Sequence, residues 1–190
     1  MSRVGIPPAH KEWAKYLRSM QEESCSVTNY ISDDGLQAIH IFASKSNQKT
    51  FAATVGLMDV DMQSPSGSVI HSEVLMDKRG PDASMGNVLS TIAFYVMRDG
   101  WRIAPGTVFE SLVEMYIPGT GLPHVLFVSP WQSDSLSRVQ ILDRTIYPLV
   151  AAPISQEESL LARSNRGLDL ESRWEKMSTD VLDWNRKSAV

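Results

Sequence analysis

Ala152-Pro153-Ile154-Ser155-Gln156-Glu157-Glu158 marks the change from a strand to a helix near the C-terminus of the chain. An apolar strand is expected over residues 146–150, and it should end at Pro153. Ser155 and Glu158 have the spacing of a capping box, in which the Ser hydroxyl and the Glu carboxylate accept hydrogen bonds from free backbone amides. The stretch therefore predicts a helix that begins just after Ser155.

The residues that follow predict a second short helix and a last turn. Gly167 is expected to close the first helix as a left-handed residue beyond its C-terminus. The second helix has its apolar residues on one side: Leu168, Leu170, Trp174 and Met177. The last turn places Val181, Leu182 and Trp184 next to Asp183 and Arg186. None of these patterns predicts catalytic chemistry.

Hydrophobic spacing predicts the remaining elements. Residues 9–23 are expected to form an amphipathic helix, because Trp13, Tyr16, Leu17 and Met20 follow the helical period. Asp82 caps a second apolar helix that ends at Asp99-Gly100, and its apolar stripe is expected to face the core. Strands are expected over residues 36–42, 50–57, 69–76, 108–116 and 125–128, with one or two more between residues 138 and 150.

This order of elements predicts an α+β fold with a mixed, largely antiparallel β-sheet flanked by helices. Strict alternation of strands and helices is absent. A doubly wound parallel sheet is the alternative, and it is disfavoured because the connections between the first three strands are too short for crossover helices.

Composition predicts one domain spanning residues 1–190. A chain of this length with 43% hydrophobic residues can bury roughly 70% of its unfolded surface. The single cysteine, Cys25, allows no intramolecular disulfide, which favours a reducing compartment. No signal peptide or membrane-spanning stretch is recognisable, so a cytoplasmic protein without a membrane partner is expected.

The charge balance makes nucleic acid an unexpected partner. Eighteen basic and twenty-two acidic residues give a net charge of -4, and no cluster of Lys and Arg is longer than the one in Asp77-Lys78-Arg79. The mild acidity would suit a basic protein partner, although the same charge is typical of many cytosolic proteins.

Motifs for catalysis or cofactor binding are sparse, so no metal and no cofactor are expected. His10, His40, His71 and His124 are widely separated and lack metal-ligand spacing. His124 begins a strand beside the glycine-rich loop at residues 118–121 and could face a cleft, which leaves a hydrolase centred on His124 as an alternative. No G-x-S-x-G nucleophile elbow supports it. Asp59 and Asp61 form a D-x-D pair, which is most often a solvated loop.

The order of several motifs resembles the suppressor-of-fused family. The matching stretches are residues 50–59, residues 70–76, Ala104-Pro105-Gly106, residues 124–130, and the series Pro153-Ile154-Ser155-x-x-Glu158, Gly167 and Asp183-x-x-Arg186. The resemblance covers residues 39–186. It departs from the family pattern at Asp59, where the family has a serine, and only one domain is expected in residues 1–190.

The resemblance implies a non-catalytic protein-binding domain. Stand-alone bacterial members are similar to immunity proteins that bind and neutralise a cognate toxin, and this is the leading hypothesis. A general peptide-binding regulator, related to the animal Hedgehog-pathway suppressor, is the second. The expected partner-binding residues are Asp59, Asp61, His124 and Trp131, and Trp131 is equally well explained as a core residue. The sequence does not indicate the oligomeric state.

Overall fold

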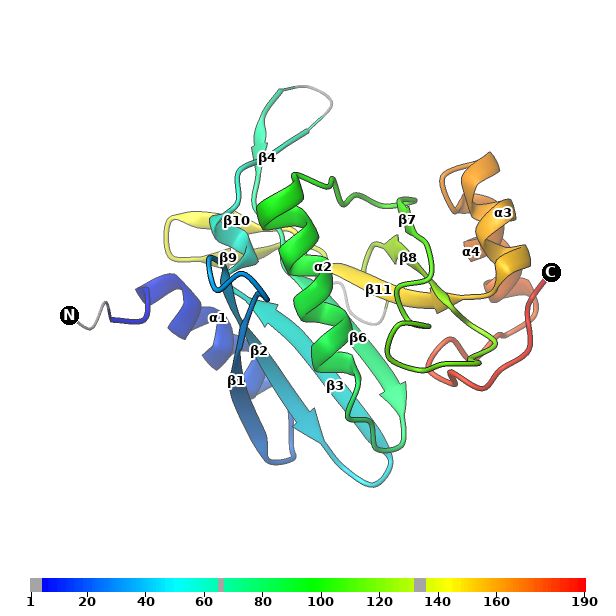
Figure 1. The fold of residues 1–190 in the computed structure, drawn as a ribbon, viewed down its shortest axis with the longest axis horizontal. Coiled ribbons are helices and arrows are strands. Elements are labelled where there is room, and N and C mark those ends of the chain that lie inside the picture. The colour runs from blue at the N-terminus through cyan, green and yellow to red at the C-terminus, as the bar shows by residue number, and fades with distance from the viewer. Residues whose placement is uncertain (1–4, 65–66, 132–135) are drawn as a thin grey trace.

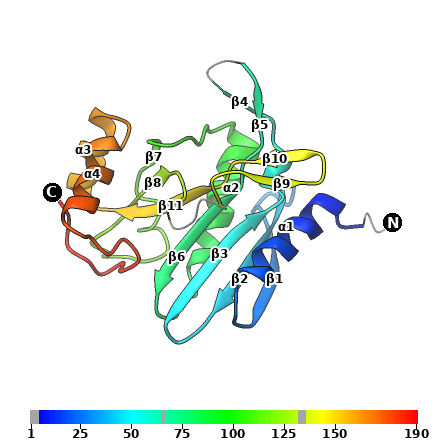
Figure 2. The same ribbon diagram turned by 180° about the vertical axis from the view of Figure 1, so that it is seen from behind.

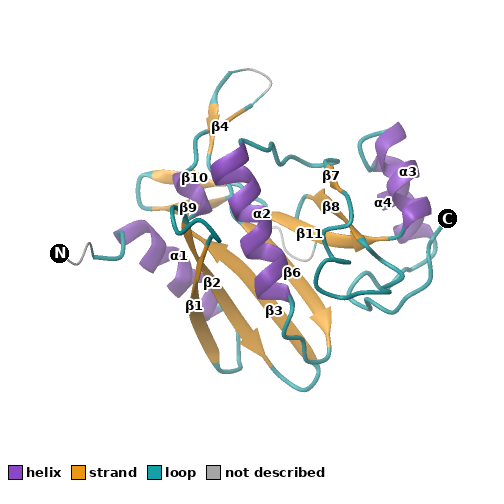
Figure 3. Ribbon diagram, in the orientation of Figure 1, coloured by secondary structure: helices purple, strands orange, loops and turns teal. Residues whose placement is uncertain are grey.

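The computed structural model describes residues 5–64, 67–131 and 136–190, and it has the α+β architecture that the sequence predicts (Figure 1, Figure 3). The helices of this described part are α1 (Pro8–Ser19), the 3-10 helix η1 (Leu57–Asp59), α2 (Met85–Asp99), α3 (Gln156–Ser164) and α4 (Leu168–Lys176). Its strands are β1 (Cys25–Ile31), β2 (Ala38–Lys45), β3 (Lys49–Val55), β4 (Met62–Gln63), β5 (Val69–Ile70), β6 (Val74–Arg79), β7 (Val108–Phe109), β8 (His124–Val128), β9 (Val139–Ile141), β10 (Arg144–Ile146) and β11 (Leu149–Ile154).

Seven of the described strands form one mixed sheet in the order β1-β2-β3-β6-β11-β8-β7. Neighbouring strands are antiparallel except β6 and β11, which run parallel where Leu149 pairs with Val74. Two small antiparallel ladders, β4-β5 and β9-β10, lie beside the main sheet. The largely antiparallel mixed sheet confirms the predicted fold class.

Helices cover both faces of the sheet. The apolar stripe of α2, including Leu89 and Ile92, packs on one face, while Trp13 and Leu17 of α1 pack on the other (Figure 1, Figure 2). The indole of Trp13 also donates a hydrogen bond to the Thr54 carbonyl oxygen. Helices α3 and α4 lie at the far end, against β8 and β11, and complete a third apolar cluster.

The C-terminal helices form largely as the sequence predicts. Ser155 and Glu158 make both hydrogen bonds of the capping box at the start of α3. Gly167 adopts a left-handed conformation (φ 83°), and its amide donates to the Ala162 carbonyl of α3. It lies two residues beyond the C-cap Asn165 and caps the start of α4, so the residue directly after that cap is Arg166 (φ 48°) rather than Gly167. Only part of the predicted apolar side of α4 is buried, because Leu168 and Met177 are exposed.

Four of the predicted strands have different bounds. The strand over 36–42 begins only at residue 38, since residues 32–37 form a turn that leaves Leu36 exposed. The strand over 69–76 is split into β5 and β6, and the strand over 108–116 ends at residue 109 because turns follow. The strand expected over 146–150 does not end at Pro153.

Strand β11 continues through Pro153. At this residue it pairs with β8 on one side, and its other side has no paired strand in the described part of the chain because β6 pairs with β11 only as far as Val150. A proline amide is tolerated where no ladder bond is required. The predicted helix over 9–23 is shorter and ends at Ser19. Strand β1 was not predicted at all.

No helix among the described residues combines the length and the apolar character needed to cross a membrane.

Candidate functional site

The expected pair of carboxylates follows the left-handed residue Gly56, at the end of β3. A Cβ atom at Gly56 would lie 2.9 Å from Cε1 of His10, so this position needs both the backbone freedom and the small size of glycine (φ 118°). Helix η1 then carries Asp59, whose carboxylate accepts hydrogen bonds from Nε2 of His10 at 2.8 Å and from Arg144 at 2.5 Å. Asp59 therefore links α1 to β10.

The surroundings of Asp59 hold it in the charged form. Burial alone would raise the pKa of the Asp59 carboxyl, but the hydrogen bonds from Arg144 and His10 outweigh burial and lower the pKa below its ordinary value. The carboxylate keeps 45% of its side-chain surface exposed. It remains accessible to a partner while serving a structural link.

Asp61 lies two residues further and is exposed. It borders a surface depression of about 340 Å³ together with Trp101 and Arg102, from the segment that follows α2. Trp101 is 45% exposed, so the depression joins an acidic side chain to an exposed aromatic ring. Exposed aromatic rings and arginines, here Trp101 and Arg102, are side chains that protein interfaces commonly use.

His124 does not face a cleft. It is 4% exposed, its Nδ1 accepts a hydrogen bond from the Ser111 amide at 2.8 Å, and its Nε2 therefore donates to the Gln156 side-chain oxygen, also at 2.8 Å. Both ring nitrogens are thus engaged: Nε2 links β8 to α3, and Nδ1 links β8 to the turn at Ser111. This geometry gives the hydrolase alternative no support and places His124 away from the accessible surface.

Trp131 is 43% exposed and lies across the ring of Trp174 in an edge-to-face contact, with 6.3 Å between ring centroids. The two rings border a groove of about 740 Å³ whose other walls include Glu171 and Glu175 of α4. Trp131 therefore packs on the protein and also presents surface to solvent.

The four expected residues thus occupy three places rather than one site. Asp59 and Asp61 lie two residues apart in the segment after β3, where Asp59 contacts α1 and β10 and Asp61 borders the depression beside Trp101. His124 contacts α3, and Trp131 contacts α4. No group of three or more possible metal-ligating side chains occurs among the residues described.

A buried carboxylate that sequence reasoning did not single out lies beneath the Asp59 loop. Glu73 is fully buried and accepts hydrogen bonds from the Thr54 hydroxyl, from the Gly56 amide at 2.8 Å and from the Met58 amide at 3.2 Å. Burial raises the pKa of Glu73 to about 8, although these hydrogen bonds oppose the shift. Glu73 fixes the shape of the loop that carries Asp59.

A second buried carboxylate joins the C-terminal motifs. Glu158 of the capping box pairs with Arg186 through two hydrogen bonds, at 2.7 and 2.9 Å, and also accepts from the indole of Trp174. Burial alone would raise the pKa of Glu158, but Arg186 and the Ser155 amide outweigh burial and lower the pKa. Both residues belong to the series that resembles the family, but their separation of 28 residues gave no indication that they form a pair.

Comparison with known proteins agrees with this arrangement of motifs. The family model described as Suppressor of fused protein (SUFU) matches residues 32–187. The chain belongs to the suppressor-of-fused family. The matched range includes the Glu73 loop, the Glu158–Arg186 pair and all four expected residues, and it confirms the resemblance recognised in the sequence.

A bacterial protein is similar to this chain over nearly the whole length of both. The chain is 28% identical over 193 residues to the Immunity protein YqcF of Bacillus subtilis (strain 168), covering 98% of this chain and 100% of that protein.

Solved structures of suppressor-of-fused proteins share the fold. A putative homologue from Neisseria gonorrhoeae FA 1090 superposes with a TM-score of 0.74 at 15% identity, covering 96% of this chain and 95% of the other. A chain of the Sufu–Fu complex gives a TM-score of 0.66 at 16% identity, covering 97% and 93%. Drosophila Suppressor of Fused gives 0.59 at 15% identity, with 96% of this chain but only 51% of the Drosophila chain covered. This chain therefore spans about half of the Drosophila protein.

Proposed function

We propose that this protein is a cytoplasmic immunity protein that binds and neutralises a cognate toxin without catalysis. The observation that carries the proposal is the relationship to Immunity protein YqcF, which extends over the whole of both chains. Full-length coverage matters because the shared region then includes every candidate surface, not only the core.

Two features of the chain support a protein partner. The net charge of -4 suits a basic partner, and the Asp59 carboxylate is partly exposed. The exposed Asp61 borders a depression together with an exposed tryptophan, Trp101. The Sufu–Fu complex supports the same mode of action, since a chain of this fold there forms a complex with another protein. We propose Asp59, Asp61 and Trp131 as partner-binding residues and omit the buried His124.

A growth-rescue experiment tests the proposal. The C-terminal domain of each large secreted protein encoded beside this gene is expressed under an inducible promoter in a heterologous bacterial host. We expect one such domain to arrest growth, the present protein to restore it, and the two purified proteins to form a stoichiometric complex by size-exclusion chromatography with light scattering. Failure to rescue any domain that arrests growth, together with no complex, would overturn the proposal.

Variants of the surface residues then locate the interface. Asp61→Lys should weaken the complex at least tenfold, whereas Glu114→Lys, an equal charge change at another exposed position, should not. Trp131→Ala separates its two interpretations: weaker binding at an unchanged Tm supports a contact with the toxin, and a lower Tm with unchanged binding supports packing on Trp174.

A further inference from the structure

The two edges of the main sheet differ in length and in cover. Strand β7 has two residues, and α3 packs against it, with an ion pair between Arg163 and Glu110 beside it. Strand β1 has seven residues, and β2 is its only partner among the described strands (Figure 1). The backbone of β1 therefore presents a row of hydrogen-bonding groups along its outer side.

Strand β1 lacks the devices with which natural sheets protect their edges. Its sequence, Cys-Ser-Val-Thr-Asn-Tyr-Ile, has no proline and no charged residue. Its pairing with β2 is continuous from Cys25 opposite Ser44 to Ile31 opposite Ala38, without a bulge. A regular, uncharged edge of this length is a template for an added strand.

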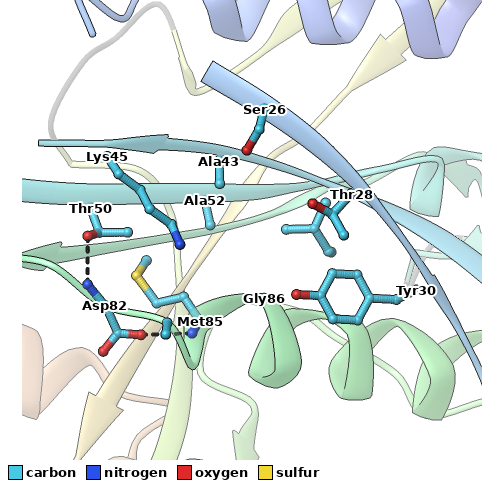
Figure 4. Close-up of a pocket in the computed structure, with 12 residues that line it drawn as sticks. Ser26, Thr28, Tyr30, Ala43, Lys45, Thr50, Ala52, Asp82, Met85 and Gly86 are labelled. Carbon is cyan, nitrogen blue, oxygen red and sulfur yellow. Dashed lines mark hydrogen bonds between the residues drawn. The ribbon is translucent and has the colours of Figure 1, made fainter. Parts of the chain in front are cut away.

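Both faces of β1 are also accessible. Val27 and Ile31, on the face of α1, are 51% and 62% exposed. On the other face, Thr28 and Tyr30 border a narrow groove between the edge and the start of α2 (Figure 4). The Tyr30 hydroxyl lies close against Gly86 of α2, where a Cβ atom would come within 2.2 Å of it. This contact positions β1 while leaving its outer side open.

The charges around β1 specify the chemistry of an added strand. Exposed carboxylates stand at both ends, Glu22 and Glu23 before the strand and Asp33 and Asp34 after it. Arg18 bonds the Glu23 carbonyl, and Arg98 bonds Asp99 while also attracting Asp34. The Asp34 carboxylate accepts hydrogen bonds from Ser32 and Leu36, so Glu22, Glu23 and Asp33 are the more available charges. Lys45 points into the groove beside α2 (Figure 4). A strand with basic residues at its two ends would complement this edge.

The same charges disfavour a second copy of the chain. Antiparallel self-pairing centred on Thr28 would place Glu22 opposite Asp34 and Glu23 opposite Asp33. Like charges directly opposite one another destabilise a ladder.

We propose that the outer edge of β1 binds an extended segment of a protein partner, with an uncharged, β-branched core of about seven residues and Lys or Arg at both ends. Backbone hydrogen bonds to β1 supply the attachment, and the four flanking carboxylates select the basic ends. The binding site on β1 is independent of the proposed immunity function. Only the identity of the partner, the toxin, rests on that function.

A synthetic peptide tests the edge without any toxin. The full-length protein is titrated against fluorescein-labelled Lys-Lys-Thr-Val-Thr-Val-Thr-Val-Thr-Lys-Lys, and binding is followed by fluorescence anisotropy at low salt. We expect the Lys-flanked peptide to bind saturably. The affinity should be at least tenfold lower for the same peptide with Glu in place of Lys, and for Lys-flanked peptides N-methylated on alternate backbone amides. Absence of binding, or equal binding of the N-methylated peptides, would overturn the proposal.

Paired variants locate the peptide on β1. Val27→Lys and the double variant Glu23→Lys/Asp33→Lys should each weaken binding at least tenfold, because each introduces positive charge at the edge. Val27→Thr and Glu114→Lys/Asp143→Lys are the matched controls and should bind as the parent does, and thermal unfolding should show that all four variants fold. Equal binding by Val27→Lys and Val27→Thr would contradict the assignment to β1.

Two further results separate the possible failures. If the protein dimerises by light scattering and Val27→Lys makes it monomeric, the occupant is a second copy and the proposal is wrong. If Val27→Lys loses the peptide but still rescues growth from the toxin, the proposed function stands and the toxin is not the partner of this edge.

Discussion

Glu73 and Glu158 are both fully buried, yet the protein treats the two carboxyls in opposite ways. Glu158 pairs with the Arg186 guanidinium, and its pKa lies below the ordinary value. Glu73 is bonded by a hydroxyl and backbone amides, with no cation among its described partners, and its pKa rises to about 8. Burial raises the pKa of both groups, so the presence of a counter-charge decides which form is stable.

The difference corresponds to two structural tasks. Glu158 closes the far end of the molecule, where its carboxylate holds the Trp174 indole, the Ala189 amide and Arg186 together. Glu73 shapes the loop from Gly56 to Met58 from below. One end is therefore fixed by an ion pair, and the loop of Asp59 is fixed by a carboxyl that is largely neutral below pH 8.

The largest expected effect comes from breaking the ion pair. Arg186→Ala should lower the free energy of unfolding by about 3–5 kcal/mol, because it leaves the Glu158 charge buried without a partner. Urea denaturation followed by circular dichroism measures this. Arg186→Lys keeps the charge but loses the two-pronged geometry, so it should fall between the parent and Arg186→Ala. A loss below about 1 kcal/mol in Arg186→Ala would show that the pair is not needed at this end.

The next effect is a pH dependence produced by Glu73. A carboxyl whose pKa is raised from 4.5 to about 8 on folding contributes stability below pH 4.5 and loses it as the pH rises toward 8. Glu73→Gln imitates the protonated form, so the parent should lose stability relative to this variant by up to about 1.4 kcal/mol per pH unit in that window. Urea denaturation of both proteins at several pH values measures the difference.

The sign of this difference distinguishes the two glutamates. Glu158 has a lowered pKa, so its contribution is present above its ordinary pKa and is lost as the pH falls through the folded value. A stability difference between the parent and Glu73→Gln that stays flat from pH 4.5 to 8 would mean that Glu73 ionises as it does in the unfolded chain.

A smaller effect tests the hydroxyl that serves Glu73. Thr54 is fully buried, donates to Glu73 and accepts a hydrogen bond from the Val74 amide at 2.8 Å. Thr54→Val keeps the shape but leaves that amide without its acceptor, which should cost about 1–3 kcal/mol. The same substitution at the exposed Thr28 should change stability by less than about 0.5 kcal/mol. Equal effects at the two positions would contradict the role assigned to Thr54.

The sequence predicted the elements whose signals are local. The capping box of Ser155 and Glu158 and the helix ending at Gly100 were found because both depend on residues within a few positions of one another. The prediction of a strand over 108–116 was wrong beyond residue 109. Leu112 and Val113 are buried within turns, so their apolar character did not indicate the backbone conformation. Strand β1 was missed because most of its residues are exposed and its alternation of apolar and polar residues breaks after Thr28, at Asn29 and Tyr30.

The candidate site was harder to predict because its contacts join distant segments. Asp59 was expected to bind a partner, but its bonds to His10 and Arg144 span 49 and 85 residues. His124 was singled out from its place beside a glycine-rich loop, and its burial against Gln156 depends on the docking of α3. Glu73 lay within a family motif, yet nothing near it in the sequence indicated that its carboxyl would be buried.

The smallest effect is expected for an exposed ion pair, and it tests whether burial, rather than pairing itself, makes the Glu158–Arg186 contact strong. Arg163 and Glu110 form an ion pair in which the side chains are 50% and 56% exposed. Water solvates both charges before and after the pair forms, so Arg163→Ala should cost no more than about 1 kcal/mol. Urea denaturation should give this small cost at low salt and a still smaller cost at high salt, because salt screens exposed charges. If Arg163→Ala instead lowered the free energy of unfolding about as much as Arg186→Ala, the exposed pair would be essential for holding α3 over the short edge strand β7. Burial would then not explain why the Glu158–Arg186 pair is strong.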